Sequence, residues 1–209
     1  MANTDRRSFL GAAMGAIPLA FMAQRVTAQS ARPQSTVAHS MTPQSVNPST
    51  PRKAVPVPHG EDRLGEPHTL GVSSTAFKVI TRDSGGDLFI TEHTNGKKGG
   101  PPRHLHHHED EWFYVLEGEY VAEIGSDRFQ LKPGDSILGP REMPHVWAFV
   151  GETKGKLLIA FAPANQMEAF FQEEMSRHRA AYSNSASVDD KERFREYGME
   201  LLGPPLSIG

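Results

Sequence analysis

Cysteine is absent from this chain of 209 residues. Its absence excludes disulfides, a thiolate nucleophile, a thiolate metal site and a lipid-modified N-terminal cysteine. Long apolar runs are also missing. The uncharged stretch from Gly11 to Gln24 falls short of the roughly 20 apolar residues of a membrane-spanning helix, and Pro18 interrupts it. Stability must therefore come from packing and from any metal that the chain binds.

The first 28 residues have the order of an export signal. Arg6-Arg7-Ser8-Phe9-Leu10 precedes the uncharged stretch, and Val26-Thr27-Ala28 offers the small residues that a signal peptidase needs. This order resembles a twin-arginine signal peptide. Asp5 and Gly11 depart from the usual pattern, so the general secretion pathway stays open as an alternative. We expect cleavage after Ala28 and a mature protein that is periplasmic or secreted.

Residues 29–65 have the composition of a disordered linker, with six prolines between residues 29 and 58 among Ser, Thr, Gln and Asn.

The chain also has no excess of basic residues. Loss of residues 1–28 removes Arg6, Arg7 and Arg25 together with Asp5, which changes the formal net charge from −3 to about −5. Because nucleic acids and anionic lipids attract basic surfaces, we expect no nucleic-acid partner, and no membrane partner after signal cleavage.

The folded part begins near Glu66 and is rich in short strand patterns. Segments of Phe, Val, Ile, Thr and aromatic residues alternate with Gly and Pro turns, which predicts an all-β sandwich or barrel over residues 66–163. The expected strands are Thr75–Thr81, Leu88–Glu92, Trp112–Glu117, Tyr120–Ile124, Arg128–Leu131, Ser136–Leu138, Val146–Val150 and Lys156–Phe161. Residues 164–209 predict a helical extension, with helices over Asn165–Ala181 and Val188–Leu202, the second capped by Ser187 with Asp190.

The candidate chemistry lies in the segment from Gly100 to Glu111. Alternate residues of a strand share a face, so His104 and His106 project to one side about 7 Å apart at the backbone. Glu111 has the opposite parity, so a turn through residues 107–110 must return its carboxylate to that side. Imidazole with carboxylate suits Mn, Fe, Co, Ni, Cu or Zn better than Ca or Mg.

Two motifs in this region resemble those of the cupin superfamily of single-domain barrels. His104-x-His106, four residues, Glu111, six residues and Gly118 resembles the first cupin motif. Gly134, five residues, Pro140, four residues and His145 resembles the second. The resemblance covers roughly Leu70 to Pro163. It implies a cupin jelly-roll barrel with one metal held by His104, His106, Glu111 and His145. Lys98, Glu142 and Phe149 replace the Gly, Gly and Asn that are usual in these motifs, at positions that bind no metal in the family.

The remaining histidines admit other interpretations. His104 to His108 could be a histidine-rich surface turn, although that leaves Glu111 and His145 unexplained. His106 could pair with His108 instead of His104, at a spacing that the family does not have. We expect His107 and His108 at the rim, and His68, His93 and His178 to be structural or exposed.

The segment Glu109 to Gly118 and the tail from Tyr197 to Leu206 are most similar to quercetin-dioxygenase-like cupins. This likeness implies a metal-dependent dioxygenase, an oxidoreductase acting on a phenolic or enolic small molecule, in which Glu111 takes the hydroxyl proton. The expected cofactor is one divalent transition metal, with Mn or Fe favoured and Ni, Cu or Zn possible. Two alternatives stay open: a non-catalytic periplasmic small-molecule binding module, and an oxygen-independent isomerase or lyase.

We expect apolar walls around such a substrate, formed by Phe113, Val115, Met143 and Trp147, although each of these also fits an ordinary barrel core. Small cupins commonly pair, so a homodimer is a further expected partner state.

Overall fold

The structure is a computed structural model that describes residues 54–65, 67–177 and 187–208. The expected signal peptide, residues 29–53 of the expected linker and His178 lie outside the described residues. Within the described ranges, no helix combines the length and the apolar character that crossing a membrane requires.

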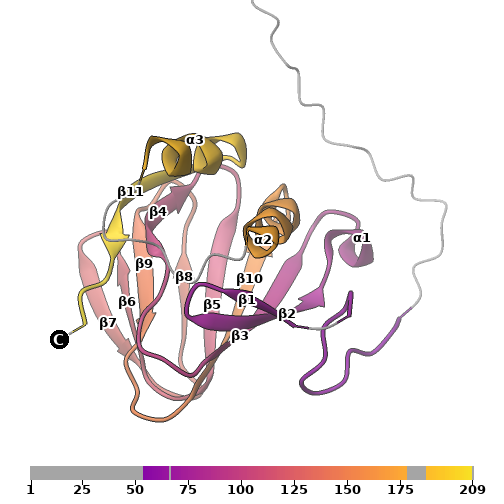
Figure 1. Ribbon diagram of the computed structural model, residues 1–209, viewed down its shortest axis with the longest axis horizontal. Helices are drawn as coiled ribbons and strands as arrows, with labels where there is room; N and C mark the ends of the chain where they lie inside the picture. The colour runs from indigo at the N-terminus through magenta and orange to yellow at the C-terminus, as the bar shows by residue number, and fades with distance from the viewer. Residues whose placement is uncertain (1–53, 66, 178–186, 209) are drawn as a thin grey trace, which may run out of the picture. The chain divides into compact units, whose positions relative to one another are not determined.

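Two antiparallel sheets make up the described fold (Figure 1). One has the strand order β1-β2-β3-β10-β5-β8 and the other the order β11-β4-β9-β6-β7. Their strands are β1 (His68–Leu70), β2 (Ser73–Val79), β3 (Phe89–Asn95), β4 (Pro102–His106), β5 (Asp110–Glu117), β6 (Tyr120–Ile124), β7 (Asp127–Leu131), β8 (Ser136–Gly139), β9 (His145–Phe149), β10 (Gly155–Ala162) and β11 (Met199–Pro205). This arrangement is a jelly-roll barrel, and the all-β prediction is confirmed.

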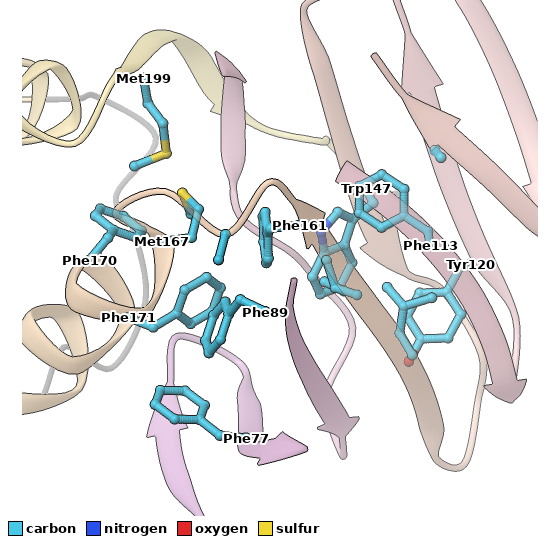
Figure 2. Packing of buried hydrophobic residues seen from close by; sticks show 14 of the residues in the cluster. Phe77, Phe89, Phe113, Tyr120, Trp147, Phe161, Met167, Phe170, Phe171 and Met199 are labelled. Atoms are coloured by element: carbon cyan, nitrogen blue, oxygen red, sulfur yellow. The ribbon is translucent and has the colours of Figure 1, made fainter. Parts of the chain in front are cut away.

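Buried and partly exposed residues alternate along the strands, so that one face of each sheet packs into the core of the barrel. In β10, Leu157, Ile159 and Phe161 are buried, whereas the residues between them are partly exposed. The paired strand β3 alternates in the same way along its whole length. Figure 2 shows the aromatic side chains that these faces bring together. Each such side chain contributes roughly 1.5–3 kcal/mol when it is fully buried.

Two glycines, Gly99 and Gly100, allow the backbone before β4 to lie close to β9. The backbone at Gly99 exchanges two hydrogen bonds with Phe149, N to O at 3.0 Å and 2.9 Å. A Cβ added to Gly100 would lie 1.9 Å from the carbonyl oxygen of Trp147. No other residue type fits there without moving backbone. In the resembled motif the glycine stands at the position of Lys98. In this chain the close contact that requires glycine lies two residues later, at Gly100.

The C-terminal segment forms two helices and a strand. Helix α2 (Met167–Ser176) and helix α3 (Val188–Glu196) are present, and Ser187 caps α3 with Asp190 as predicted. The prediction that the second helix continues to Leu202 is wrong. Gly198, at φ +73°, follows the end of α3, and Met199 to Leu201 instead pair with β4. Figure 1 shows β11, in yellow, running beside β4.

A buried ion-pair cluster joins the two helices of this segment. Arg193 of α3 pairs with Glu174 of α2 and with Asp190 of its own helix. All three side chains are buried. The Arg193–Glu174 pair thus links α3 to α2. Removal of one partner from a buried ion pair is strongly destabilising, because the other charge is left uncompensated.

Contacts with the barrel already occur before Glu66, in residues that the sequence places in the linker. Nζ of Lys156 lies 3.4 Å from Nε2 of His59, and the carbonyl of Glu61 accepts a hydrogen bond from Lys78. The Asp62 carboxylate accepts hydrogen bonds from the backbone N–H groups of Phe77 and Leu64. Arg63 makes a two-point ion pair with Asp83 of the short helix α1 (Thr81–Ser84). Linker composition does not reveal the contacts with Phe77 and Asp83, because these partners lie 15 and 20 residues away in the sequence.

Candidate metal centre

Strand pairing brings four distant side chains to one point inside the barrel. His104 and His106 lie on the same face of β4, and His145 begins β9 directly opposite His104. β4 ends at His106 and β5 starts at Asp110, so the intervening turn returns Glu111 to the same side. The four residues are buried, and one ligand atom from each lies within 4.8 Å of the others. The structure thus contains a buried His-His-Glu-His group that could hold a metal.

The three imidazoles converge on one carboxylate oxygen. Oε2 of Glu111 lies 2.8 Å from Nε2 of His145, 3.1 Å from Nε2 of His106 and 3.7 Å from Nε2 of His104. The same nitrogen of each ring therefore faces the centre.

The opposite nitrogen of each ring is held by an acceptor outside the group. Nδ1 of His104 lies 2.8 Å from the carbonyl of Pro102, and Nδ1 of His145 lies 2.9 Å from the carbonyl of Met143. A carbonyl can only accept, so each Nδ1 carries the proton. The neutral ring then turns the lone pair of Nε2 toward the centre, which is the tautomer that binds a metal.

His106 is held in the same way by a buried carboxylate, Glu109. Its Nδ1 lies 2.7 Å from Oε1 of Glu109, whose other oxygen accepts a hydrogen bond from Asn165. Glu109 is almost completely buried. A carboxylate that orients a metal-binding histidine is a recurrent second partner of such centres. No pattern in the sequence predicted a role for Glu109 or Asn165; the one local signal was an acidic residue three positions after His106.

This donor set fits a divalent metal. Three imidazole nitrogens and a carboxylate that point at one another are stable when a proton or a metal ion lies between them. Burial lowers the pKa of His104 to about 4, which keeps that ring neutral. Burial also opposes charge on His106, but hydrogen bonds to Glu109 and Glu111 outweigh it and raise its pKa to about 9. A metal bound at Nε2 of His106 would take the place of that proton, which leaves the ring neutral. Against its own burial, hydrogen bonds from the three histidines hold the pKa of Glu111 well below its usual value, so this carboxylate is ionised.

A cavity that offers about 70 Å³ to the centres of water molecules reaches this group and opens to solvent. Its other lining residues are mainly apolar and come from both sheets and the C-terminal segment: Leu70, Gly71, Val72, Ser73, His93, Gly100, Pro101, Trp147, Ile159, Phe161, Met167, Phe170, Phe171, Phe194 and Met199. Of the four expected wall residues, Trp147 alone lines this cavity. Phe113 and Val115 belong to the barrel core, and Met143 is partly exposed.

The other histidines take different positions. His93 is buried and lines the cavity, with its two ring nitrogens 3.2 Å and 3.1 Å from the hydroxyls of Thr75 and Thr91. Burial lowers the pKa of His93 to about 4. His107 lies partly exposed beside Glu142, and His108 and His68 are exposed. Neither His93 nor His108 belongs to the His-His-Glu-His group described above.

Glu142 stands where the resembled second motif has a glycine, and its backbone takes the conformation that favours glycine, φ +62°. Its N–H donates to the carbonyl of His106 at 2.7 Å. The turn geometry is therefore kept despite the larger residue, at a cost of about 1 kcal/mol. This turn also ties the residues before His145 to the end of β4.

The sheet order and this buried centre define a cupin jelly-roll fold, and residues 92–161 match the family model described as "Cupin domain". The matched residues include all four members of the candidate centre and leave out the C-terminal segment. The uncharacterized protein MJ1618 of Methanocaldococcus jannaschii is 32% identical over 60 residues, which cover 29% of this chain and 48% of that protein. The match thus spans about half the length of that curated relative.

Among solved structures, the chain is similar to KdgF from Halomonas sp., with a TM-score of 0.40 and 22% identity over 44% of this chain and 79% of that one. It is also similar to a predicted oxalate decarboxylase from Thermotoga maritima, with a TM-score of 0.41 and 18% identity over 44% of this chain and 80% of that one.

Proposed function

We propose that this chain is a metal-binding cupin in which His104, His106, Glu111 and His145 hold one divalent transition metal. The observation that carries the proposal is the convergence of three Nε2 atoms on one oxygen of Glu111, with each Nδ1 tied to an outside acceptor. Such a buried arrangement of lone pairs is stable when a cation occupies its centre.

Elemental analysis of the purified protein tests this directly. Wild-type protein should hold close to one equivalent of a single transition metal. His104→Ala and His145→Ala should each lose most of it, whereas His107→Ala, on the exposed rim, should keep it. Equal metal content in all four proteins would contradict the proposal. We favour Mn or Fe, with Ni, Cu or Zn as alternatives, since nitrogen and oxygen donors accept all five.

We further infer that the centre serves a dioxygenase reaction on a phenolic or enolic small molecule. The bound metal would act as a Lewis acid that lowers the pKa of the substrate hydroxyl group, and the resulting anion would be the species that reacts with dioxygen. Glu111 is ionised, the state that can take the hydroxyl proton on its carboxylate. Dioxygen would then oxidise the substrate anion by adding both of its oxygen atoms to it, and the proton held on Glu111 would return to the product.

The apolar cavity supports this chemistry, because an enolate or phenolate survives longer where bulk water is excluded. Oxygen uptake by metal-loaded protein with flavonol and catechol substrates is the test. Turnover should exceed that of the same metal free in solution and should fall at least a hundredfold in Glu111→Gln. Product formation without oxygen would favour an isomerase or lyase instead, and saturable binding without product would favour a binding module.

The N-terminal 28 residues support export through the twin-arginine pathway as the second part of the proposal. Expression of the full chain, followed by fractionation, tests it. The periplasmic protein should begin at Gln29. Arg6→Lys with Arg7→Lys should leave the protein uncleaved in the cytoplasm, and unchanged export of this variant would contradict the proposed route.

A further inference from the structure

The wall of the cavity that faces the candidate centre comes largely from the C-terminal segment. Its contributors are buried and apolar: Met167, Phe170, Phe171, Phe194 and Met199. All five lie outside residues 92–161, which match the cupin model. Figure 2 shows Met167, Phe170, Phe171 and Met199 gathered beside Phe161, with Trp147 farther along the cavity.

This wall is joined to the metal-binding strand. Met199 pairs with His106 and Leu201 with His104 in the β4–β11 ladder. The ring of Phe194 lies 5.9 Å from that of His104, edge to face. It also lies 5.2 Å from the ring of Phe170, so α2, α3 and the centre form one packed unit.

Among the described residues that line this cavity, none is Lys or Arg, and Glu111 is the one carboxylate. The other polar side chains are Ser73, which accepts a hydrogen bond from Asn95, and His93, which lies between two threonine hydroxyls. They can offer hydrogen bonds to a neutral group but no positive charge.

Charge at the centre then limits what can bind. A divalent ion with three neutral imidazoles and the two buried carboxylates, Glu111 and Glu109, has no net charge. A ligand hydroxyl whose proton passes to Glu111 leaves that total unchanged. A second anionic group would lie unpaired against phenylalanine and methionine side chains, which is strongly unfavourable.

We propose that this cavity, with the C-terminal segment as its apolar wall, selects flat apolar molecules that bring a single anionic oxygen to the metal and rejects those with a second anionic group. The inference rests on the proposed metal-binding function.

Two probes that differ in one group test the inference: 3-hydroxyflavone and 3-hydroxyflavone-4′-carboxylic acid. The chain has two tryptophans. Trp147 lines the cavity, and Trp112 is partly exposed on the outside of β5. In metal-loaded Trp112→Phe protein, quenching of fluorescence therefore reports the cavity. 3-Hydroxyflavone should bind at least tenfold more tightly than its carboxylate.

Val72 provides the matched pair of variants, because it is half-buried and lines the cavity. Val72→Arg places a cation there and should reduce the preference for 3-hydroxyflavone at least tenfold. Val72→Met, of similar length without charge, should leave the preference as it is. Phe170→Leu should weaken both probes by a similar factor, since it shortens the shared wall.

Metal content is measured on each sample to separate the two proposals. If the protein holds no metal, the proposed function fails and this inference fails with it. If metal is bound and both probes bind equally, or the carboxylate binds more tightly, the inference alone is overturned. It is overturned as well if metal is bound and neither probe binds, because the cavity then does not admit a flat aromatic molecule.

Discussion

Oε1 of Glu109 lies 2.7 Å from Nδ1 of His106, and both side chains are buried. Glu109 thereby fixes the proton on Nδ1 and directs Nε2 at the centre. Glu109→Gln keeps the volume and removes the charge, so it should weaken metal binding about tenfold or more. Titration against a competing chelator measures this. Glu119→Gln, on an exposed side chain, is the control and should bind as wild type does. Equal affinity in both variants would show that Glu109 does not orient His106.

Metal removal should lower the thermal stability of the protein. A ligand that binds only the folded state adds about 2.7 kcal/mol when its free concentration is 100 times its Kd. For a domain of this size, that corresponds to a fall in Tm of about 5 to 10 °C on chelation. Calorimetry with and without chelator measures it. In His104→Ala, which should bind little metal, chelation should leave Tm where it was. A shift of equal size in this variant would mean that the chelator acts elsewhere.

Arg193 should be far more important for stability than its neighbour Arg195. Arg193→Met leaves Glu174 and Asp190 without their buried cation, at a cost of about 3–5 kcal/mol. Arg195 lies on the same helix but is exposed, so Arg195→Met should change the free energy of unfolding by less than about 0.5 kcal/mol. Urea denaturation of the two variants makes the comparison. Similar losses in both would contradict the role of the buried cluster.

The Arg63–Asp83 ion pair should give a pH-dependent contribution to stability. Burial acts to raise the pKa of Asp83, but hydrogen bonds from Arg63 and from the backbone of Ile80 outweigh it and lower the pKa below 3.8. The contribution is therefore full above pH 3.8, the value in the unfolded chain, and is lost as the pH falls through the lower folded value. Asp83→Asn should cost about 0.5–1 kcal/mol at pH 7 and at pH 5, and clearly less near pH 3.

Urea unfolding at several pH values measures this difference. Asp87→Asn, on an exposed carboxylate of the same turn, should show no such pattern. A penalty for Asp83→Asn that persists unchanged at pH 3 would indicate that the lost interaction is not the ion pair.

Much of the fold was predictable because its strands bury one face. Strand-favouring residue types bounded by Gly and Pro turns identify the segments that became β5, β6 and β10 within one or two residues of their observed ends. The helical prediction for residues 199–202 failed for a physical reason. Met199 and Leu201 fit a helical pattern as well as a strand, and their pairing with β4, more than 90 positions earlier in the chain, decides between the two.

The spacing of His104, His106 and Glu111 in the sequence was sufficient to nominate these residues, because strand parity and the need for a turn follow from local geometry. The roles of Glu109, Asn165 and His93 were not accessible in this way. Asn165 reaches Glu109 across 56 positions, and His93 enters the cavity because β3 pairs with β10 and β2. No periodicity within one segment contains such information.

By itself, the sequence determined the class of fold, the nature of the donor atoms and the mild acidity of the chain, since each depends on residue type and short-range order. The tertiary structure decided which nitrogen of each imidazole faces the centre, and that Phe170 and Phe194 line a cavity whose described lining residues include no Lys or Arg. These properties arise where segments far apart in the chain pack together, and packing depends on shape and on the burial of every partner at once.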